Sequence, residues 1–295
     1  MLPKIYTIMF WFSILLAIIS LVTVAVFGLR FGVDFLGGSV LELEFKSRPE
    51  ISAIKSSATT LISDLEISPA GDNGVIIRTH ELSETEHQDL LKNLNDSFLS
   101  SVVHERQFSS IGPVIGNELK HKSVIGIVIV LLGVIVYIAF VFRKIGRTTS
   151  SWAMGLAAII ALVHDVAIPL GVFSVLGKYY GIEISGIFVA AALTILGFSV
   201  SDTVVIFDRV RENIINGKNK GDFGSVVHRS VMQTLTRSLN TVFSVLLSLF
   251  AIYLFGGESI KYFSLAMIIG IFLGAYSSIF VASPILVWFS RKGTR

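Results

Sequence analysis

Long apolar runs and short alternating segments divide the chain into two kinds of sequence. About 20 apolar residues at ~1.5 Å rise per residue cross the ~30 Å apolar core of a bilayer as a helix. Six runs are long enough or nearly so, and they cover residues 5–27, 124–142, 152–176, 186–207, 239–255 and 263–289. The fifth is short unless its helix begins earlier, near Val231. The pattern predicts an α-helical polytopic membrane protein with six transmembrane helices, the first retained as an anchor because its apolar core exceeds that of a signal peptide.

The segment between the first two runs alternates instead with a period of two or has helical spacing. It predicts, in order, a strand at 40–45, a helix at 50–61, strands at 64–68 and 75–79 around the turn 71–74, a helix at 83–99 and a strand at 101–108. Ser83 and Glu86 form a capping-box pattern at the start of the second helix. The order βαββαβ predicts a small α+β, ferredoxin-like domain. We therefore expect an N-terminus and first helix at 1–28, this domain at 29–122, and helices 2–6 at 123–295.

Composition supports a membrane protein and leaves little room for metal or catalytic chemistry. Hydrophobic residues make up 53% of the chain and charged residues 15%, which one water-soluble core could not accommodate. Cysteine is absent, so neither a disulfide nor a thiolate metal site can form. The histidines are scattered and no HExxH motif occurs. We expect no metal, no cofactor and no enzymatic activity.

Basic residues are concentrated in alternate short loops, and this predicts the topology. They follow the second, fourth and sixth runs, at Arg143, Lys144, Arg147, Arg209, Arg211, Lys218, Lys220, Arg229, Arg237, Arg291, Lys292 and Arg295. By the positive-inside rule both termini are cytoplasmic and residues 29–122 face outward. The basic excess belongs to these loops, so it does not call for a nucleic-acid partner.

The strongest candidate chemistry is an acid inside the fourth run, Asp202. An ionised Asp at bilayer depth costs roughly 2.5–3.5 kcal/mol, so it is usually given a partner or a task. Arg237, at the cytoplasmic start of the fifth run, is the expected counter-ion. A polar track accompanies the pair on both helices: Thr194, Ser199, Ser201, Thr203, Gln233, Thr234, Asn240, Thr241 and Ser244. An acid that is ionised beside Arg237 and protonated away from it is a proton switch; the alternative is a static ion pair that fixes two helices.

Two further features allow two interpretations each, and a third has one expected role. Asp165 lies next to His164 and four residues before Pro169, and counting from the ends of the apolar runs places it deeper in the membrane than Asp202. It is either a second proton station or part of a capped helix kink. Glycine-rich joints on both sides of the outward domain are either plain connectors or a hinge pair, and they contain Gly32, Asp34, Gly37, Gly38, Gly112 and Pro113. The charges after the fourth run, Asp208, Arg209 and Arg211, are typical of a solvated membrane anchor.

These motifs together resemble the SecD/SecF family of protein-export membrane proteins, and its shorter SecF branch in particular, within the resistance-nodulation-division superfamily. Residues 32–38 are similar to the family's GIDFTGG, residues 199–213 to SINDTVVVFDRIREN, and residues 233–238 to QTLxRS. The resemblance extends over nearly the whole chain. Leu36 stands in place of the usual threonine, and Ser201 in place of the asparagine next to the acid, where a serine can orient Asp202 less strongly.

The resemblance implies a SecF-like subunit of the bacterial inner membrane that works with SecD. Such a subunit couples proton flow to late translocation of unfolded polypeptides through SecYEG, in some systems with YajC and YidC. It places Asp202 and Arg237 on the proton path and residues 29–122 in the periplasm. Two alternatives remain open. One is half of a related small-molecule or lipid exporter, and the other is an intramembrane aspartyl protease that uses Asp165 and Asp202. The GxGD signature of such proteases does not occur around Asp202.

Overall fold

The chain forms two compact units. The computed structural model describes residues 2–98, 103–142, 151–216 and 222–292. One unit comprises Met1–Arg30 with Ile125–Arg295, and the other Phe31–Val124. The loop charges at 143–147, 218–220 and 295 on which the topology prediction partly rests lie outside the described residues.

Six helices in the described part of the chain are long and apolar enough to cross a membrane, which confirms the predicted fold class. They are α1 (Lys4–Phe27), α5 (Pro113–Val141), α6 (Ser151–Tyr180), α7 (Gly186–Ile215), α8 (Phe223–Phe255) and a sixth that comprises α9 (Glu258–Ser277), a π-helical segment (Ser278–Ala282) and α10 (Ser283–Lys292). Several extend past the apolar runs that predicted them. The reason is that hydropathy marks only the membrane part of a helix, while hydrogen bonding continues it into polar sequence.

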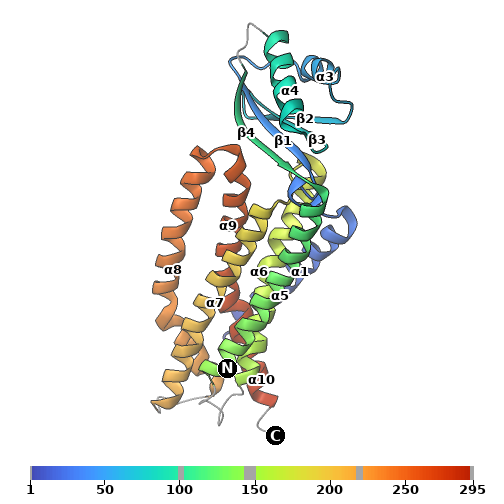
Figure 1. Cartoon of the computed structure of the whole chain (residues 1–295). Coiled ribbons are helices and arrows are strands. Elements are labelled where there is room, and N and C mark those ends of the chain that lie inside the picture. Colours follow the sequence, from blue (N-terminus) through green and yellow to red (C-terminus); the bar gives the residue numbers. More distant parts are fainter. Residues whose placement is uncertain (1, 99–102, 143–150, 217–221, 293–295) are drawn as a thin grey trace. The chain divides into compact units, whose positions relative to one another are not determined.

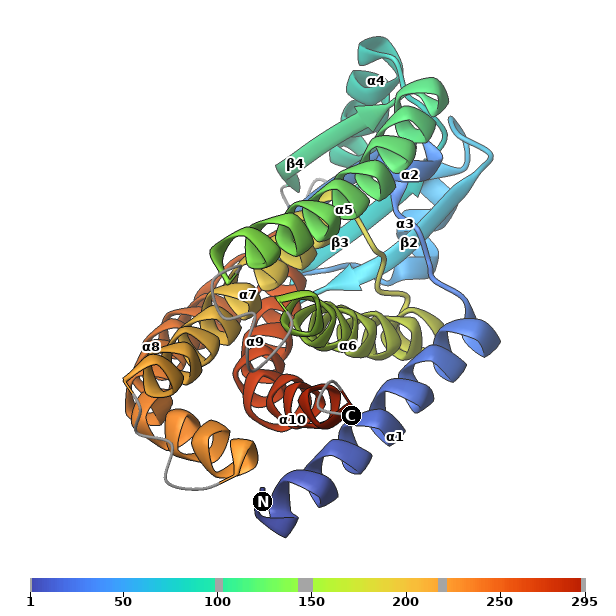
Figure 2. The same ribbon diagram turned by 90° about the horizontal axis from the view of Figure 1, so that it is seen from below.

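Helix α9 is the centre of the helical unit. It contacts α6, α7 and α8, while α1 packs along α6 (Figures 1 and 2). Glycines permit the close approach, because a Cβ added at Gly270 would overlap three carbon atoms of the Ile195 side chain on α7. One turn on, Gly274 lies against Ser199 of the same helix. This is the small-residue packing that membrane helices use in place of a hydrophobic driving force.

The π-helical segment Ser278–Ala282 ends α9 and begins α10. Its physical cause is Pro284, which has no N–H to donate and whose ring would clash with the carbonyl four residues before it. The widened turn relieves that clash. The Ser278 carbonyl accepts the Ser283 hydroxyl at 2.9 Å, so a buried acceptor stays satisfied. Such segments are frequent at functional sites.

The second unit is a four-stranded antiparallel sheet with two helices, in the predicted βαββαβ order. Its elements are β1 (Gly38–Phe45), α3 (Ile51–Ala58), β2 (Leu65–Ala70), β3 (Gly74–Thr79), α4 (Glu84–Ser97) and β4 (Val103–Ile111). The strands lie in the order β2-β3-β1-β4. Leu43, Ile54 and Leu90 are fully buried between the sheet and the helices. The capping box of Ser83 and Glu86 is formed at the start of α4, as predicted.

The two glycine-rich joints contact each other. Residues Val33–Leu36 form a short helix, α2, which the sequence pattern did not predict, and Gly37 ends it with φ +80°. A Cβ at Gly37 would lie 2.7 Å from the Pro113 Cα at the start of α5. Gly116 packs on the same turn, where an added Cβ would lie 3.0 Å from the Gly37 nitrogen. We call this contact of Gly37 with Pro113 and Gly116 the glycine clasp.

We expect Gly37→Ala to open the glycine clasp. Alanine is strained at positive φ, by about 1–2 kcal/mol, and its Cβ would also press on the backbone of Pro113. The measurement is limited proteolysis of the full chain in detergent, followed at the sites flanking residues 31–38. Gly71→Ala is the matched control, since Gly71 also has positive φ (+59°) but nothing within 4 Å. Equal protease resistance of the two variants would contradict a packed clasp.

Candidate functional site

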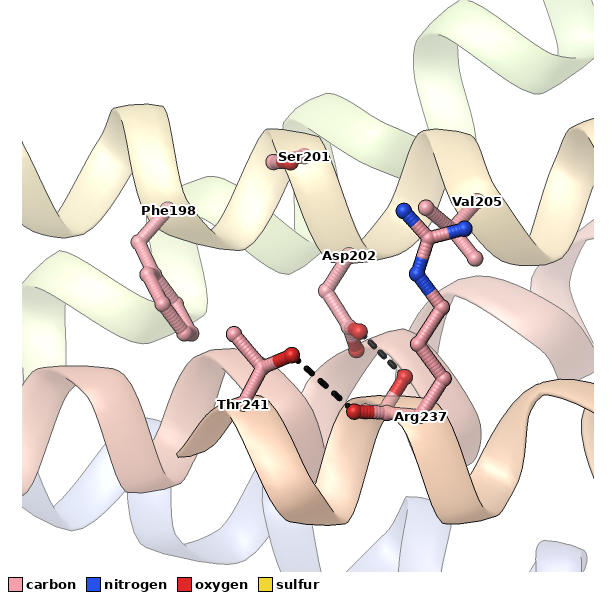
Figure 3. A pocket seen from close by; sticks show the side chains of 7 residues that line it. Phe198, Ser201, Asp202, Val205, Arg237 and Thr241 are labelled. Atoms are coloured by element: carbon pink, nitrogen blue, oxygen red, sulfur yellow. Dashed lines mark hydrogen bonds between the residues drawn. The ribbon is translucent and has the colours of Figure 1, made fainter. Parts of the chain in front are cut away.

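Asp202 lies at the middle of α7, beside a small cavity between α7 and α8. The cavity measures about 100 Å³ and is lined by Phe198, Ser201, Asp202, Val205, Arg237, Ser238 and Thr241 (Figure 3). Asp202 Oδ1 accepts a hydrogen bond from the Ser238 hydroxyl. Its Oδ2 is buried and has no hydrogen-bond partner among the described residues. A buried carboxylate oxygen without a donor is costly if charged and is therefore a ready place for a proton.

Arg237 shares this cavity but does not form the expected ion pair with Asp202. Its side chain extends along Val205, away from the carboxylate (Figure 3). No ion pair joins Arg237 to an acid in the part of the chain that the structure describes. A long side chain with four rotatable bonds can hold its charge in water and keep its stem on apolar surface. The cation therefore lies near the acid without neutralising it.

A second, larger cavity lies on the other side of Arg237, among α5, α7 and α8. It measures about 500 Å³. Its lining includes Asp208, Arg209, Glu212 and Gln233, and it shares Val205 and Arg237 with the cavity at Asp202. Polar groups of both charges make this space suitable for water. Arg237 thus stands between a polar cavity and the half-buried Asp202.

Asp165 is fully buried, and side chains of three helices, α6, α7 and α9, form hydrogen bonds with its carboxylate. Its Oδ2 accepts the Ser199 hydroxyl of α7 at 2.6 Å and the Ser277 hydroxyl of α9 at 2.7 Å. Its Oδ1 lies 2.9 Å from His164 Nδ1 of its own helix. His164 Nε2 is buried without a partner among the described residues and the ring lies over Tyr276. This side chain ties α6, α7 and α9 together.

Asp165 of α6 and Asp202 of α7 lie at similar depths when both are measured along the axis of α7. Ser199, which contacts Asp165, precedes Asp202 by three residues, or roughly 4.5 Å along the axis. The expectation that they lie at different depths is therefore wrong. It failed because α7 continues to Ile215, so counting from the end of the apolar run placed Asp202 too near the cytoplasm.

The predicted polar track separates into an inner and an outer part. Ser199, Thr203 and Thr234 are buried; Ser199 and Thr203 reach Asp165 and Ser278, whereas Thr234 bonds the backbone of its own helix. The remaining members are exposed on this chain: Thr194, Ser201, Gln233, Asn240, Thr241 and Ser244. The hydroxyls of Thr241 and Ser244 bond carbonyls of α8 itself. Within this chain, the polar face of α8 does not face the bundle interior.

The charges after the apolar part of α7 form contacts that join α7 to α8. Arg209 donates to Gln233 Oε1 at 2.7 Å and to Glu212 at 2.5 Å. Asn213, nearly fully buried, donates to the same Gln233 oxygen at 2.9 Å. Arg211 lies 3.4 Å from Asp208. The segment is therefore more than a solvated anchor, because it fixes the start of α8 and with it the position of Arg237.

Sequence reasoning did not single out Ser238, Ser277 or Ser278 as site residues. Ser238 follows Thr234 by four residues and so shares its face, which was an available signal. Ser277 and Ser278 carry no such signal in the sequence, and only the fold shows that Ser277 bonds Asp165 and that Ser278 bonds Thr203 beside Asp202. The described residues contain no group of three or more His, Asp or Glu arranged to hold a metal ion. What the site offers is two acids, an arginine and hydroxyls, which can bind and pass protons.

Comparison with known proteins gives consistent matches across the chain. The family model for "Protein export membrane protein SecD/SecF, C-terminal" matches residues 91–292, and that for the "SecD/SecF GG Motif" matches residues 22–47. A protein translocase subunit SecF from Thermobaculum terrenum is 39% identical, with 95% of this chain and 90% of that protein covered. The SecF subunit from Synechocystis sp. is 35% identical over the same shares of both chains.

Solved structures match as well. The crystal structure of SecDF, a translocon-associated membrane protein from Thermus thermophilus, has a TM-score of 0.79 and 29% identity. The match covers 97% of this chain but 38% of that one. A second crystal structure of SecDF, in a super-membrane-facing form, has a TM-score of 0.67 and 30% identity. The present chain therefore spans well under half of those longer chains.

Proposed function

The chain belongs to the SecD/SecF family of protein-export membrane proteins, and on that premise we propose that it couples proton flow across a membrane to the translocation of polypeptides. It is a SecF-like, multi-pass membrane subunit of the Sec translocation pathway. The coupling is our proposal. We propose Asp202 as the acid that takes up and releases the proton, Arg237 as the cation that controls its charge, and Asp165 as a second station.

One observation carries the proposal: an unsatisfied buried carboxylate oxygen lies next to an arginine that borders a polar cavity. Asp202 Oδ2 lacks a donor, and Arg237 lines the cavities on both sides. If the guanidinium turns to Asp202, it holds the acid ionised; if it turns away, as here, burial favours a proton on the acid. Moving one charge through the membrane field is worth ~2.3 kcal/mol per 100 mV, which can drive a change of shape.

The exposed polar face of α8 supports a partner with a similar helical half. Asn240 would face lipid if the six helices acted alone, and lipid offers its side-chain amide no hydrogen bonds. Sites of proton-driven transporters typically lie where two such halves meet. We propose SecD as the partner, as the longer SecDF chains suggest. The translocon SecYEG and the accessory proteins YajC and YidC complete the proposed assembly.

The proposed setting is the bacterial inner membrane, with both termini cytoplasmic and residues 29–122 as a periplasmic domain. The exported chain would meet that domain after it leaves the translocon. The relatives are named as subunits of a translocase, and we propose no catalytic reaction for this chain. The protease alternative is disfavoured by Asp165, whose carboxylate is already occupied by two serine hydroxyls and His164. The exporter alternative differs in the partner it requires.

Co-purification tests the partner. We expect the native chain, isolated from its own membranes with a mild detergent, to bring down a SecD protein at equal stoichiometry and SecYEG at lower yield. Asn240→Leu with Ser244→Leu should reduce SecD recovery at least about fivefold, because the polar contacts across the interface are lost. Recovery of a lone homo-oligomer, or of an outer-membrane exporter component, would contradict the assignment. Phe243→Leu, an exposed apolar position on the same helix, is the matched control.

A further inference from the structure

Ser277, the last residue of α9, and Ser278, the first residue of the π-helical segment, lie between the two acids. Ser277 donates to Asp165 Oδ2 at 2.7 Å, and Ser278 shares a hydrogen bond of 2.9 Å with Thr203, the neighbour of Asp202. Successive residues of a helix point about 100° apart, so the pair faces α6 with one side chain and α7 with the other. Both serines and Asp165 are fully buried. Their hydroxyls must therefore find partners inside the protein.

Both hydroxyls also reach the same backbone acceptor. Ser278 Oγ donates to the Gly274 carbonyl at 2.8 Å, and Ser277 Oγ lies 3.2 Å from that oxygen. The Gly274 carbonyl already accepts the backbone N–H of Ser278. A carbonyl oxygen has two lone pairs, so one hydroxyl at a time can bond it well. In this structure Ser278 holds that place, and Ser277 donates to Asp165 by its shorter bond.

We propose that Ser277 and Ser278 exchange the Gly274 carbonyl between them and thereby couple the charge of Asp165 to that of Asp202. The inference rests on the proposed proton role of Asp202. When Asp165 takes up a proton, its oxygen becomes a weaker acceptor, and the Ser277 hydroxyl turns to Gly274. The Ser278 hydroxyl is displaced toward Thr203 and the Asp202 carboxylate, to which it can donate. Release of the proton reverses both rotations, and no covalent bond changes.

The surroundings of the pair suit such an exchange. The titratable and charged groups that face the acids are Arg237 from α8 at Asp202, and His164 from α6 with Tyr276 from α9 at Asp165. No described residue bonds Asp202 Oδ2, so that oxygen is available. The π-helical segment begins at Ser278 itself, and such segments are frequent at functional sites. The two serines are positioning residues, because they act through the acids.

A carboxyl titration tests the coupling. The full chain is reconstituted into liposomes with the SecD protein of the same organism. Infrared difference spectra then follow the protonated-carboxyl band that Asp202→Asn removes. We expect Asp165→Asn to shift the pH midpoint of that band by about one unit in the wild-type background. In the Ser277→Ala or Ser278→Ala background the same substitution should shift it by less than about 0.3 unit, because two acids that are no longer coupled titrate nearly independently.

The controls separate coupling from packing. Ser264→Ala is matched, because Ser264 is a fully buried serine of α9 that bonds the Ile260 carbonyl; there the one-unit shift should persist. Ser278→Thr keeps the hydroxyl and should restore the shift, whereas Ser278→Cys keeps the volume with a weaker donor and should not. A full shift in Ser277→Ala and in Ser278→Cys overturns the inference. If instead Asp202→Asn leaves the spectrum and proton-driven export unchanged, the proposed function itself has failed.

Discussion

Asp202→Asn should abolish proton-driven export while leaving the chain folded and assembled. Asparagine keeps the shape and can still accept the Ser238 hydroxyl, but it cannot bind or release a proton. Loss of a positioned acid–base group typically costs 10²- to 10⁴-fold, so we expect proton flux to fall by on the order of a hundred-fold. The measurement is quenching of a pH-sensitive dye in proteoliposomes that contain the chain with SecD, together with release of an exported reporter from cells.

Two variants bracket this result. Asp202→Glu keeps the titratable group and should retain part of the flux, since the cavity beside it leaves space for one more methylene. Asp89→Asn removes an exposed carboxylate from α4 and should behave as wild type. Export at the wild-type rate in Asp202→Asn, with proton dependence intact, would show that the acid is structural and that the chain acts as a passive scaffold.

Gly270→Val should prevent α9 from packing against α7. Its Cβ alone would overlap the Ile195 side chain, which is itself buried. Overpacking of a tight core costs about 1–3 kcal/mol, and a β-branched side chain at this contact should reach the upper end or exceed it. Because α9 also carries Ser277, the variant should lose the contact to Asp165 as well. We expect aggregation of most of the protein in detergent, measured by size-exclusion chromatography and thermal unfolding.

The contact of Gly270 with Ile195 indicates which second substitution should compensate for a larger residue at Gly270. Ile195→Ala removes the atoms that a Cβ at Gly270 would meet, so Gly270→Ala with Ile195→Ala should recover most of the monodisperse protein that Gly270→Ala alone loses. Gly133→Val on α5 is the control, since nothing lies within 4 Å of that position. Failure of Ile195→Ala to relieve Gly270→Ala would mean that the α7 to α9 approach is set by other contacts.

Local physics made much of the fold predictable. The capping box at Ser83 needs only a serine and a glutamate three residues apart, and a span needs only a run of apolar residues. The helix ends were less predictable, because α8 begins at Phe223, well before its apolar part. Helix α2 was missed for another reason: four residues carry no periodicity, and their conformation depends on the contact between Gly37 and Pro113.

The site was predictable in its acids and not in their partners. An Asp in an apolar run is conspicuous wherever it points, so Asp202 and Asp165 could be chosen from sequence. The hydroxyls that bond Asp165 depend on how three helices pack together. Ser199 and Ser277 are 78 positions apart in the sequence, and no local pattern predicts that both contact the same carboxylate. The ion pair of Asp202 with Arg237 was inferred only from their opposite charges and similar depths. A flexible arginine can lie at that depth and direct its charge to water instead of to the carboxylate.

The exposed polar face of α8 has a consequence for the lifetime of this subunit in the cell. A chain that has not met its other half presents Asn240 on the surface of the helical unit, where lipid leaves its amide unsatisfied. Membrane proteases and chaperones act on just such exposed polar groups in unassembled helices. We therefore expect orphan copies to be short-lived, so that degradation, rather than matched synthesis, keeps the two halves in equal number.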